Sequence, residues 1–283
     1  MKLVRYTSRS RKADRPLVGV LSEDGCSVRA VGDSLTRLLE SEDPIVVATA
    51  AMTGSWQSLD DVVLLPPIER QEVWAAGVTY LRSKAARMEE SEFSASAYDR
   101  VYEAARPEIF FKAIAEKVMG PGEAIGVRRD SRWTVPEPEL ALVFNSRGQG
   151  VGCTVANDVS ARDIEGENLL YLPQAKIYTG SCALGPCLTV GVDEATVRGW
   201  TIALEIQRAG AVVFSGQTEI GRLKRSFVEL GRYLFASQEF PCGTVLLTGT
   251  GVVPPDDFHL LPADEVAISV SGIGTLRNPV KTV

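Results

Sequence analysis

Histidine is nearly absent from this chain, which has a single one, His259, among 283 residues. Histidine is the usual base of serine hydrolases and a frequent zinc ligand. No Gly-x-Ser-x-Gly segment offers a nucleophile for a Ser-His-Asp triad, so that chemistry is excluded. Because one histidine and scattered cysteines make a poor zinc site, any metal must be held by oxygen atoms, which favours Mg²⁺, Mn²⁺ or Ca²⁺.

Paired cysteines and phosphate-binding loops are also missing. The five cysteines form no Cys-x-x-Cys pair, which excludes a zinc or disulfide framework and predicts reduced, mostly buried thiols. They are Cys26, Cys153, Cys182, Cys187 and Cys242. The segment from Gly249 to Gly251 is followed by Val-Val-Pro-Pro, so no helix opens behind it, and no Gly-Lys-Ser/Thr loop occurs. Nucleotide binding is therefore excluded.

Positive charge and long apolar runs are lacking too. The net charge is −6, which disfavours a nucleic-acid or anionic-membrane partner. The first residues contain no apolar stretch suited to a secretion signal, and no later segment approaches the apolar length of a membrane helix. We therefore expect a cytoplasmic protein with no nucleic-acid or membrane partner.

Two glutamates on alternate positions of an apolar segment are the most informative feature present. Glu137 and Glu139 belong to Thr-Val-Pro-Glu-Pro-Glu-Leu-Ala-Leu-Val-Phe, in which proline precedes each glutamate. A strand sends every second side chain to the same face, at about 3.3 Å rise per residue. The two carboxylates therefore project together, an arrangement that suits a hard cation. An exposed strand face with two solvated acids is the alternative.

A third carboxylate can join this pair. Asp158 lies beyond a Gly-rich turn at residues 147–150, so a returning strand would bring it beside Glu137 and Glu139. Three clustered carboxylates repel one another unless a cation compensates them. Lys176 follows in a segment poor in charge; it either forms a salt bridge with a nearby acid or acts as a desolvated amine that exchanges a proton.

The pattern of elements predicts an α+β, β-rich chain of two parts. Residues 1–70 are expected to form a small N-terminal α/β domain, because Pro66-Pro67 breaks helix and sheet, and residues 71–283 a β-rich body. Ser226 and Glu229 form a capping box that predicts a helix behind them. The predicted strands of the body include Glu139–Asn145, Gly150–Val155, Leu188–Val192, Thr201–Gln207, Val245–Leu247, Glu265–Val270 and Gly274–Arg277.

Four segments together resemble the fumarylacetoacetate hydrolase family. They are Pro-Glu-Pro-Glu-Leu-Ala-Leu-Val (136–143), Thr-Val-Ala-Asn-Asp-Val-Ser-Ala-Arg-Asp (154–163), Leu-Gly-Pro (184–186) and Leu-Thr-Gly-Thr (247–250). The resemblance runs from about Val73 to the C-terminus. It implies a mixed β-roll or sandwich, commonly dimeric, in which Glu137, Glu139 and Asp158 hold a divalent ion, usually Mg²⁺.

One departure points to a branch of this family. Its hydrolases and decarboxylases usually carry a Gly-x-Asn-Tyr-x-x-His segment whose histidine helps to activate water. This chain has Gly-Val-Thr-Tyr-Leu-Arg-Ser, with Ser83 in the place of that histidine. Together with Arg-Pro-Glu-Ile-Phe-Phe-Lys and Leu-Tyr-Leu-Pro-Gln-Ala-Lys-Ile-Tyr, the segment resembles the 2-keto-3-deoxy-D-arabinonate (pentonate) dehydratase branch, in which the lysine that matches Lys176 belongs to the active site.

The resemblance implies a hydro-lyase of pentose and sugar-acid catabolism that converts 2-keto-3-deoxy-D-arabinonate to 2,5-dioxopentanoate and water. Lys176 and Glu108 are the candidates for proton transfer, although Glu108 could equally be an exposed strand residue. The expected substrate contacts are Arg82, Ser83, Gln174 and Thr250, with Tyr171 a weaker candidate.

Two other functions stay open at this point. The first is a hydrolase or decarboxylase of the same family that acts on acylpyruvates or fumarylacetoacetate-like diketones. The second is a Mg²⁺-dependent binder of keto acids without turnover. The expected partners are a small 2-keto sugar acid and a second copy of the chain, in a homodimer or homotetramer.

Overall fold

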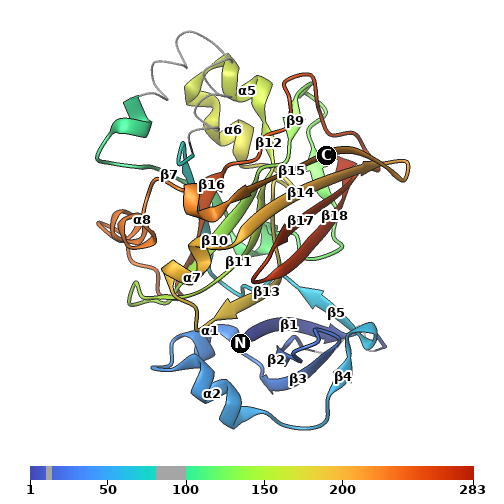
Figure 1. Ribbon diagram of the computed structural model, residues 1–283, viewed down its shortest axis with the longest axis vertical. Coiled ribbons are helices and arrows are strands. Elements are labelled where there is room, and N and C mark those ends of the chain that lie inside the picture. The colour runs from blue at the N-terminus through green and yellow to red at the C-terminus, as the bar shows by residue number, and fades with distance from the viewer. Residues whose placement is uncertain (11–14, 81–99) are drawn as a thin grey trace.

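The computed structural model describes residues 1–10, 15–80 and 100–283. An 11-stranded sheet runs through most of the molecule. Its strands are, in spatial order, β4 (Gln57–Ser58), β3 (Ser27–Gly32), β2 (Leu17–Leu21), β1 (Lys2–Ser8), β13 (Cys182–Val190), β11 (Gly150–Asp158), β10 (Pro138–Phe144), β16 (Thr244–Thr250), β6 (Glu72–Gly77) and β7 (Glu108–Ala113), with β5 (Val62–Leu65) paired to β1. Figure 1 shows β1 to β5 as a lobe below the rest of the chain.

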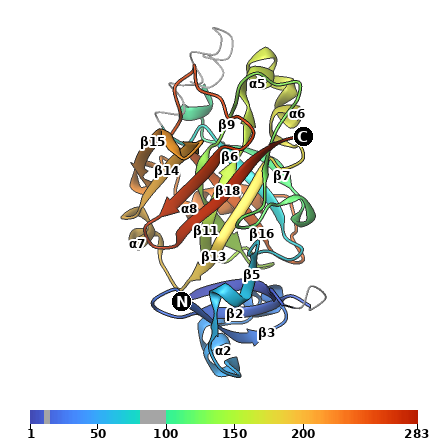
Figure 2. The same cartoon turned by 90° about the vertical axis from the view of Figure 1, so that its right-hand side faces the viewer.

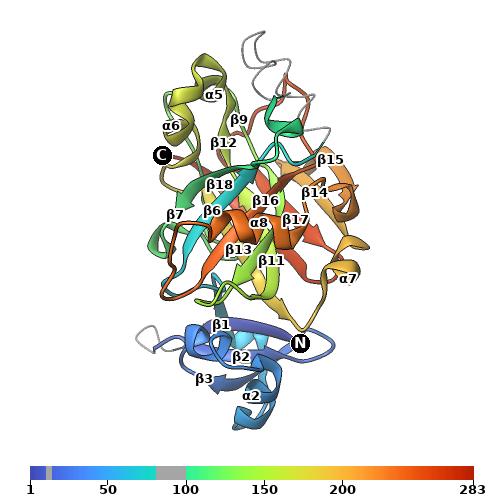
Figure 3. The same cartoon turned by 90° about the vertical axis from the view of Figure 1, so that its left-hand side faces the viewer.

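A second sheet packs against the first (Figure 3). Its strands are β15 (Ala211–Glu219), β14 (Thr201–Arg208), β17 (Glu265–Val270), β18 (Gly274–Thr282) and β8 (Ile125–Val127). The strands β9 (Thr134–Val135) and β12 (Ser160–Ala161) form a separate pair. The described helices are short: α1 (Leu35–Leu39), α2 (Pro44–Ala51), α5 (Arg162–Glu167), α6 (Leu172–Lys176), α7 (Glu194–Arg198) and α8 (Phe227–Leu234), with 3₁₀ turns at Leu59–Asp61, Ala115–Lys117, Leu169–Tyr171 and Ile220–Arg222.

Every residue of β10 is buried, because both faces of this strand contact a hydrophobic core. Leu140, Leu142 and Phe144 belong to the core between the two sheets. Ala141 and Val143 belong to a second core, which consists mainly of leucine, valine and alanine side chains. Since side chains alternate along a strand, the odd-numbered Glu137 and Glu139 continue the row of Ala141 and point to the side of this second core.

The strands from β13 to β7 close into a roll. Met119, which follows β7, forms a bridge with Ala183 in β13. The Met119 N–H donates to the Cys182 carbonyl at 2.9 Å, and the Leu184 N–H donates to the Met119 carbonyl at 3.0 Å. This closure brings β7 and β13 together, although β11, β10, β16 and β6 lie between them in the order of the sheet. Side chains of β7 can therefore reach the end of β11.

The N-terminal lobe lies below the body in Figure 2, and one sheet runs through both parts. In β1, Lys2 and Leu3 pair with Thr189 and Leu188 of β13. Leu3 also packs in the second core, together with residues of the roll. The division of the chain at residue 70 stays a prediction.

The β-rich fold class and most of the predicted strands are confirmed. β15 and the long N-terminal part of β13 were not predicted. The predicted helix is confirmed as α8, and Ser226 caps it, since its side-chain oxygen accepts the Glu229 N–H at 3.1 Å. The Glu229 carboxylate accepts a hydrogen bond from Arg225 at 2.7 Å, so only the serine half of the capping box is confirmed. Within the described ranges, no helix combines enough length with enough apolar character to cross a membrane.

The prediction of unpaired cysteines is confirmed, since all five are free thiols. Cys153, Cys182 and Cys187 are buried, whereas Cys26 is exposed and Cys242 lies between these extremes. Burial raises the pKa of the Cys182 thiol to about 12. This thiol is therefore protonated at neutral pH and a weak nucleophile.

The substitution Ser226→Ala should lower the free energy of unfolding by about 1 kcal/mol, because it removes the cap of α8. Urea denaturation followed by circular dichroism measures this loss. Val228→Ala is a matched control in the same helix. Its side chain is 78% exposed, and such surface changes stay within about 0.5 kcal/mol. Equal losses in both variants would contradict the capping role.

Candidate metal and catalytic site

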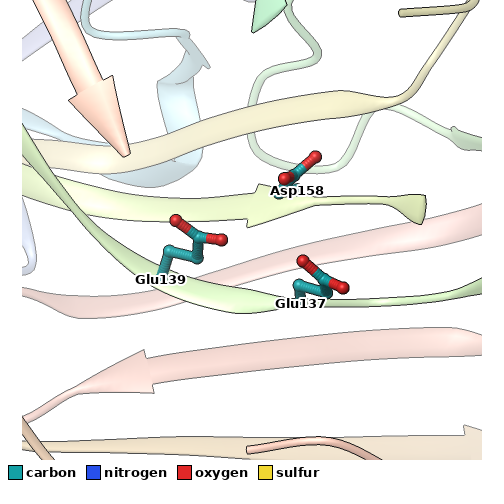
Figure 4. A group of neighbouring side chains, drawn as sticks. All are labelled: Glu137, Glu139 and Asp158. Carbon is teal, nitrogen blue, oxygen red and sulfur yellow. The ribbon is translucent and has the colours of Figure 1, made fainter. Parts of the chain in front are cut away.

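Three carboxylates meet at one end of the roll. Glu137, Glu139 and Asp158 are all buried, and each offers one oxygen such that these atoms lie within 4.8 Å of one another. Figure 4 shows Glu139 on β10, Glu137 on the segment that leads into this strand, and Asp158 on the neighbouring strand, with the three carboxylates close together. Oxygen ligands from carboxylates are those that Mg²⁺ and Ca²⁺ prefer. The cluster therefore fits a hard divalent cation.

The hairpin of β10 and β11 produces this convergence, as the sequence predicted. Pro138 pairs with Asn157 in the antiparallel register, and the Asp158 N–H donates to the Glu137 carbonyl at 3.0 Å. Asp158 therefore lies directly opposite Glu137 and on the same face. Residues opposite each other on antiparallel strands have Cβ atoms about 4.5–5.5 Å apart, so the two carboxylates can share one ion.

Three buried cations surround these acids. The Lys176 ammonium contacts Glu137 at 2.8 Å and Asp158 at 3.1 Å. Lys112 contacts the other oxygen of Asp158 at 2.5 Å, and Arg162 contacts the other oxygen of Glu137 at 2.8 Å. Each of these cationic side chains has no exposed surface. Since an unpaired buried charge costs several kcal/mol, the cations and carboxylates depend on one another.

Glu139 differs from the other two acids in its surroundings. Its Oε2 accepts the Gly249 N–H at 2.5 Å, and among the described residues no ammonium or guanidinium group forms an ion pair with it. Burial, followed by the charges of Asp158 and Glu137, holds the pKa of Glu139 well above the usual range of a glutamate. Gly249 has a φ of +91°, and a Cβ atom there would lie 2.0 Å from Thr79 Oγ1, so only glycine fits.

A cavity opens beside the three carboxylates. Among the described residues it is lined by Ala76, Gly77, Val78, Phe110, Glu137, Glu139, Asp158, Gly249 and Thr250. Thr250 pairs with Glu139 across β16 and β10 and is buried. Glu108 pairs with Gly77 across β7 and β6, and a Cβ atom on Gly77 would lie 2.0 Å from Glu108 Oε2. The Glu108 carboxylate thus packs against the wall of the cavity.

The remaining predicted substrate contacts differ in position. Gln174 is exposed on α6, two residues before the buried Lys176, and Tyr171 is 37% exposed. The structure does not bring either to the cavity lining. Arg82 and Ser83 lie outside the described residues. The roles of all four stay predictions.

Sequence reasoning missed two of the three cations. Glu108, Phe110 and Lys112 occupy alternate positions of β7, a period that would have placed Lys112 on the same face as Glu108. Arg162 lies four residues after Asp158, within the conspicuous segment at 154–163. Neither signal shows which acid the cation contacts, because those contacts arise only when the roll closes.

The comparison with protein families agrees with this geometry. Residues 72–281 match the model of the fumarylacetoacetate (FAA) hydrolase C-terminal domain. The chain belongs to the fumarylacetoacetate hydrolase family. The family resemblance predicted from the sequence is thus confirmed.

Individual members of this family are similar to the chain over almost its whole length. The chain is 39% identical to 2-dehydro-3-deoxy-D-arabinonate dehydratase of Saccharolobus solfataricus, over 99% of this chain and 96% of the relative. It is 43% identical to probable 2-keto-3-deoxyxylonate dehydratase of Haloferax volcanii, over 98% and 92%. A solved structure of 2-keto-3-deoxy-D-arabinonate dehydratase complexed with magnesium and 2,5-dioxopentanoate is 35% identical, with a TM-score of 0.84 over 100% of this chain and 99% of that one.

The thermal stabilisation by Mg²⁺ should grow as the pH rises from about 5 to 8. Because the pKa of Glu139 is raised, protonation of this carboxyl stabilises the folded, metal-free protein. That stabilisation is fully present at a pH below the usual pKa of glutamate, and it is lost as the pH rises through the pKa of Glu139. Bound Mg²⁺ requires the ionised form and offsets this loss. Scanning calorimetry with and without Mg²⁺ measures the gain in Tm. A gain that is larger at pH 5 than at pH 8 would contradict the shift, and Glu139→Gln should show little gain at either pH.

Proposed function

We propose that this protein is a Mg²⁺-dependent dehydratase that converts 2-keto-3-deoxy-D-arabinonate to 2,5-dioxopentanoate and water. The observation that carries the proposal is the contact of the Lys176 ammonium with two of the three clustered carboxylates, at 2.8 and 3.1 Å. A site for a divalent cation and a group that can exchange a proton thus lie side by side. The full-length similarity to two dehydratases supports the same reaction.

Glu137, Glu139 and Asp158 would hold the ion, because they supply three oxygen ligands in one buried cluster. Bound Mg²⁺ supplies a Lewis acid that polarises the 2-keto group and makes the protons on C3 more acidic. Mn²⁺ and Ca²⁺ also accept oxygen ligands and are alternatives to Mg²⁺ at this site.

Lys176 and Glu108 would move the protons. One removes a proton from C3, and the other protonates the C4 hydroxyl as it leaves as water, which gives an enone. Transfer of a proton from C5 to C3 then gives the C5 enol, and its tautomerisation gives the aldehyde of 2,5-dioxopentanoate. Two observations support these roles: Lys176 contacts Glu137 at 2.8 Å, and the Glu108 carboxylate lies against Gly77, which lines the cavity.

Substrate recognition would use Thr250, which lines the cavity, together with Arg82, Ser83 and Gln174. The protein would act in the cytoplasm, in pentose and sugar-acid catabolism, as a homodimer or homotetramer. Hydrolysis or decarboxylation by the same site is not favoured, because the segment from Gly77 to Ser83 lacks the histidine of the hydrolases.

Purified protein with Mg²⁺ should convert 2-keto-3-deoxy-D-arabinonate to 2,5-dioxopentanoate and leave acetylpyruvate unchanged. Product formation is followed by NMR, and addition of a chelator should abolish it. Acetate and pyruvate from acetylpyruvate, without any dioxopentanoate from the sugar acid, would contradict the dehydratase and favour the hydrolase. Mg²⁺ binding without turnover of either compound would favour a binding protein.

Glu139→Gln and Lys176→Met should separate metal binding from proton transfer. We expect Glu139→Gln to lose both Mg²⁺ affinity and turnover, since it removes a ligand. Lys176→Met should keep Mg²⁺ binding and lower kcat by about 10²-fold or more, the usual contribution of a positioned acid or base. Titration calorimetry and NMR assays measure the two properties. Full activity in either variant would refute the assigned role.

The substitution Gly77→Ala should lower kcat while the fold persists. The new Cβ would displace the Glu108 carboxylate, which is the far end of a flexible side chain. Gly32→Ala is the matched control, because no heavy atom lies within 4 Å of its added Cβ. Steady-state kinetics and thermal melting measure the effect. Unchanged kcat in Gly77→Ala would remove Glu108 from the mechanism.

A further inference from the structure

Ser160 is a buried hydroxyl beside Lys176 that the mechanism above does not use. It has no exposed surface and lies in β12, two residues after Asp158. Its hydroxyl donates to the Asp158 carbonyl at 2.9 Å. Its oxygen accepts a hydrogen bond from the Lys176 ammonium at 2.5 Å. The hydroxyl proton is therefore directed to the main chain, and a lone pair is left to face Lys176.

The described acceptors of the Lys176 ammonium are of two kinds. Glu137 and Asp158 are charged, and both are candidate metal ligands. Ser160 is neutral and offers no ligand to the cluster. A lysine ammonium has three donors. One of the three described hydrogen bonds of Lys176 is thus independent of the carboxylates that a metal ion would share.

The geometry points to Ser160 as the positioning residue of Lys176. We propose that its hydroxyl holds the amine in place for proton transfer when Glu137 and Asp158 also coordinate a divalent cation. Ser160 does not touch the substrate in this role, and it acts through Lys176. The inference rests on the proposed function, because it assigns a part in the same proton transfer.

The chain offers a matched control in Ser181. This serine is also buried, and its hydroxyl donates to the main-chain carbonyl of Lys176 at 2.9 Å. Ser160→Ala and Ser181→Ala thus each remove one buried hydroxyl that contacts Lys176. Only Ser160→Ala removes a contact with the ammonium. Comparison of the two variants therefore distinguishes an effect on the position of the amine from an effect on the stability of the segment.

The experiment compares the Mg²⁺-loaded full chain with both variants. In Ser160→Ala we expect kcat to fall by about 10- to 100-fold, the loss associated with a misplacement of about 1 Å. The KM for 2-keto-3-deoxy-D-arabinonate and the Mg²⁺ dissociation constant from calorimetry should stay within about threefold. Ser181→Ala should keep all three constants within the same range, and Ser160→Cys, which retains a weak acceptor, should recover part of the turnover.

Crystal structures of the Mg²⁺-loaded wild type and Ser160→Ala provide a measurement that needs no substrate. We expect the Lys176 ammonium of the variant to shift or to occupy several rotamers. An unmoved ammonium, equal values of kcat in the two alanine variants, or a Mg²⁺ affinity that falls together with kcat would overturn the proposal. If the wild type forms no dioxopentanoate, the proposed function fails, and the position of Lys176 in these crystals still decides the role of Ser160.

Discussion

The site depends on a buried network of ion pairs in which three cations contact two of the three clustered carboxylates. Lys176 contacts Glu137 and Asp158, Lys112 contacts Asp158, and Arg162 contacts Glu137. Loss of one member of a buried ion pair leaves an uncompensated charge and typically costs about 3–5 kcal/mol. Each member of these ion pairs therefore fixes the position of its partner. Glu137 and Asp158, two of the proposed metal ligands, form one structural unit with Lys176, the group proposed for proton transfer.

The closed roll makes this network possible. Lys112 in β7 and Asp158 at the end of β11 are separated by three strands in the order of the sheet. The bridge between Met119 and Ala183 closes the roll. Residues of β6, β7, β10, β11 and β16 then line one small cavity. Two glycines, Gly77 and Gly249, let Glu108 and Thr79 approach closely.

The acidic half of the site could be predicted from the sequence because its geometry is local. Alternation along one strand brings Glu137 and Glu139 together, and a hairpin register adds Asp158. The partners of Lys112 and Arg162 could not be predicted in the same way. Their contacts depend on closure of the roll and on the path of the chain after β11. Neither feature can be predicted from the spacing of residues along one strand. The exposure of Gln174 beside the buried Lys176 likewise follows from how α6 packs.

The contacts between acids and cations also bear on whether folding of the chain depends on a metal ion. In small domains that rely on a metal as the only compensation for their ligands, chelation unfolds the chain. Here Lys112, Lys176 and Arg162 contact Glu137 and Asp158 directly, so the chain itself compensates these two acids. We therefore expect the chain to fold without a metal ion. An ion bound at the proposed site would then be exchangeable in the folded protein, rather than trapped during folding.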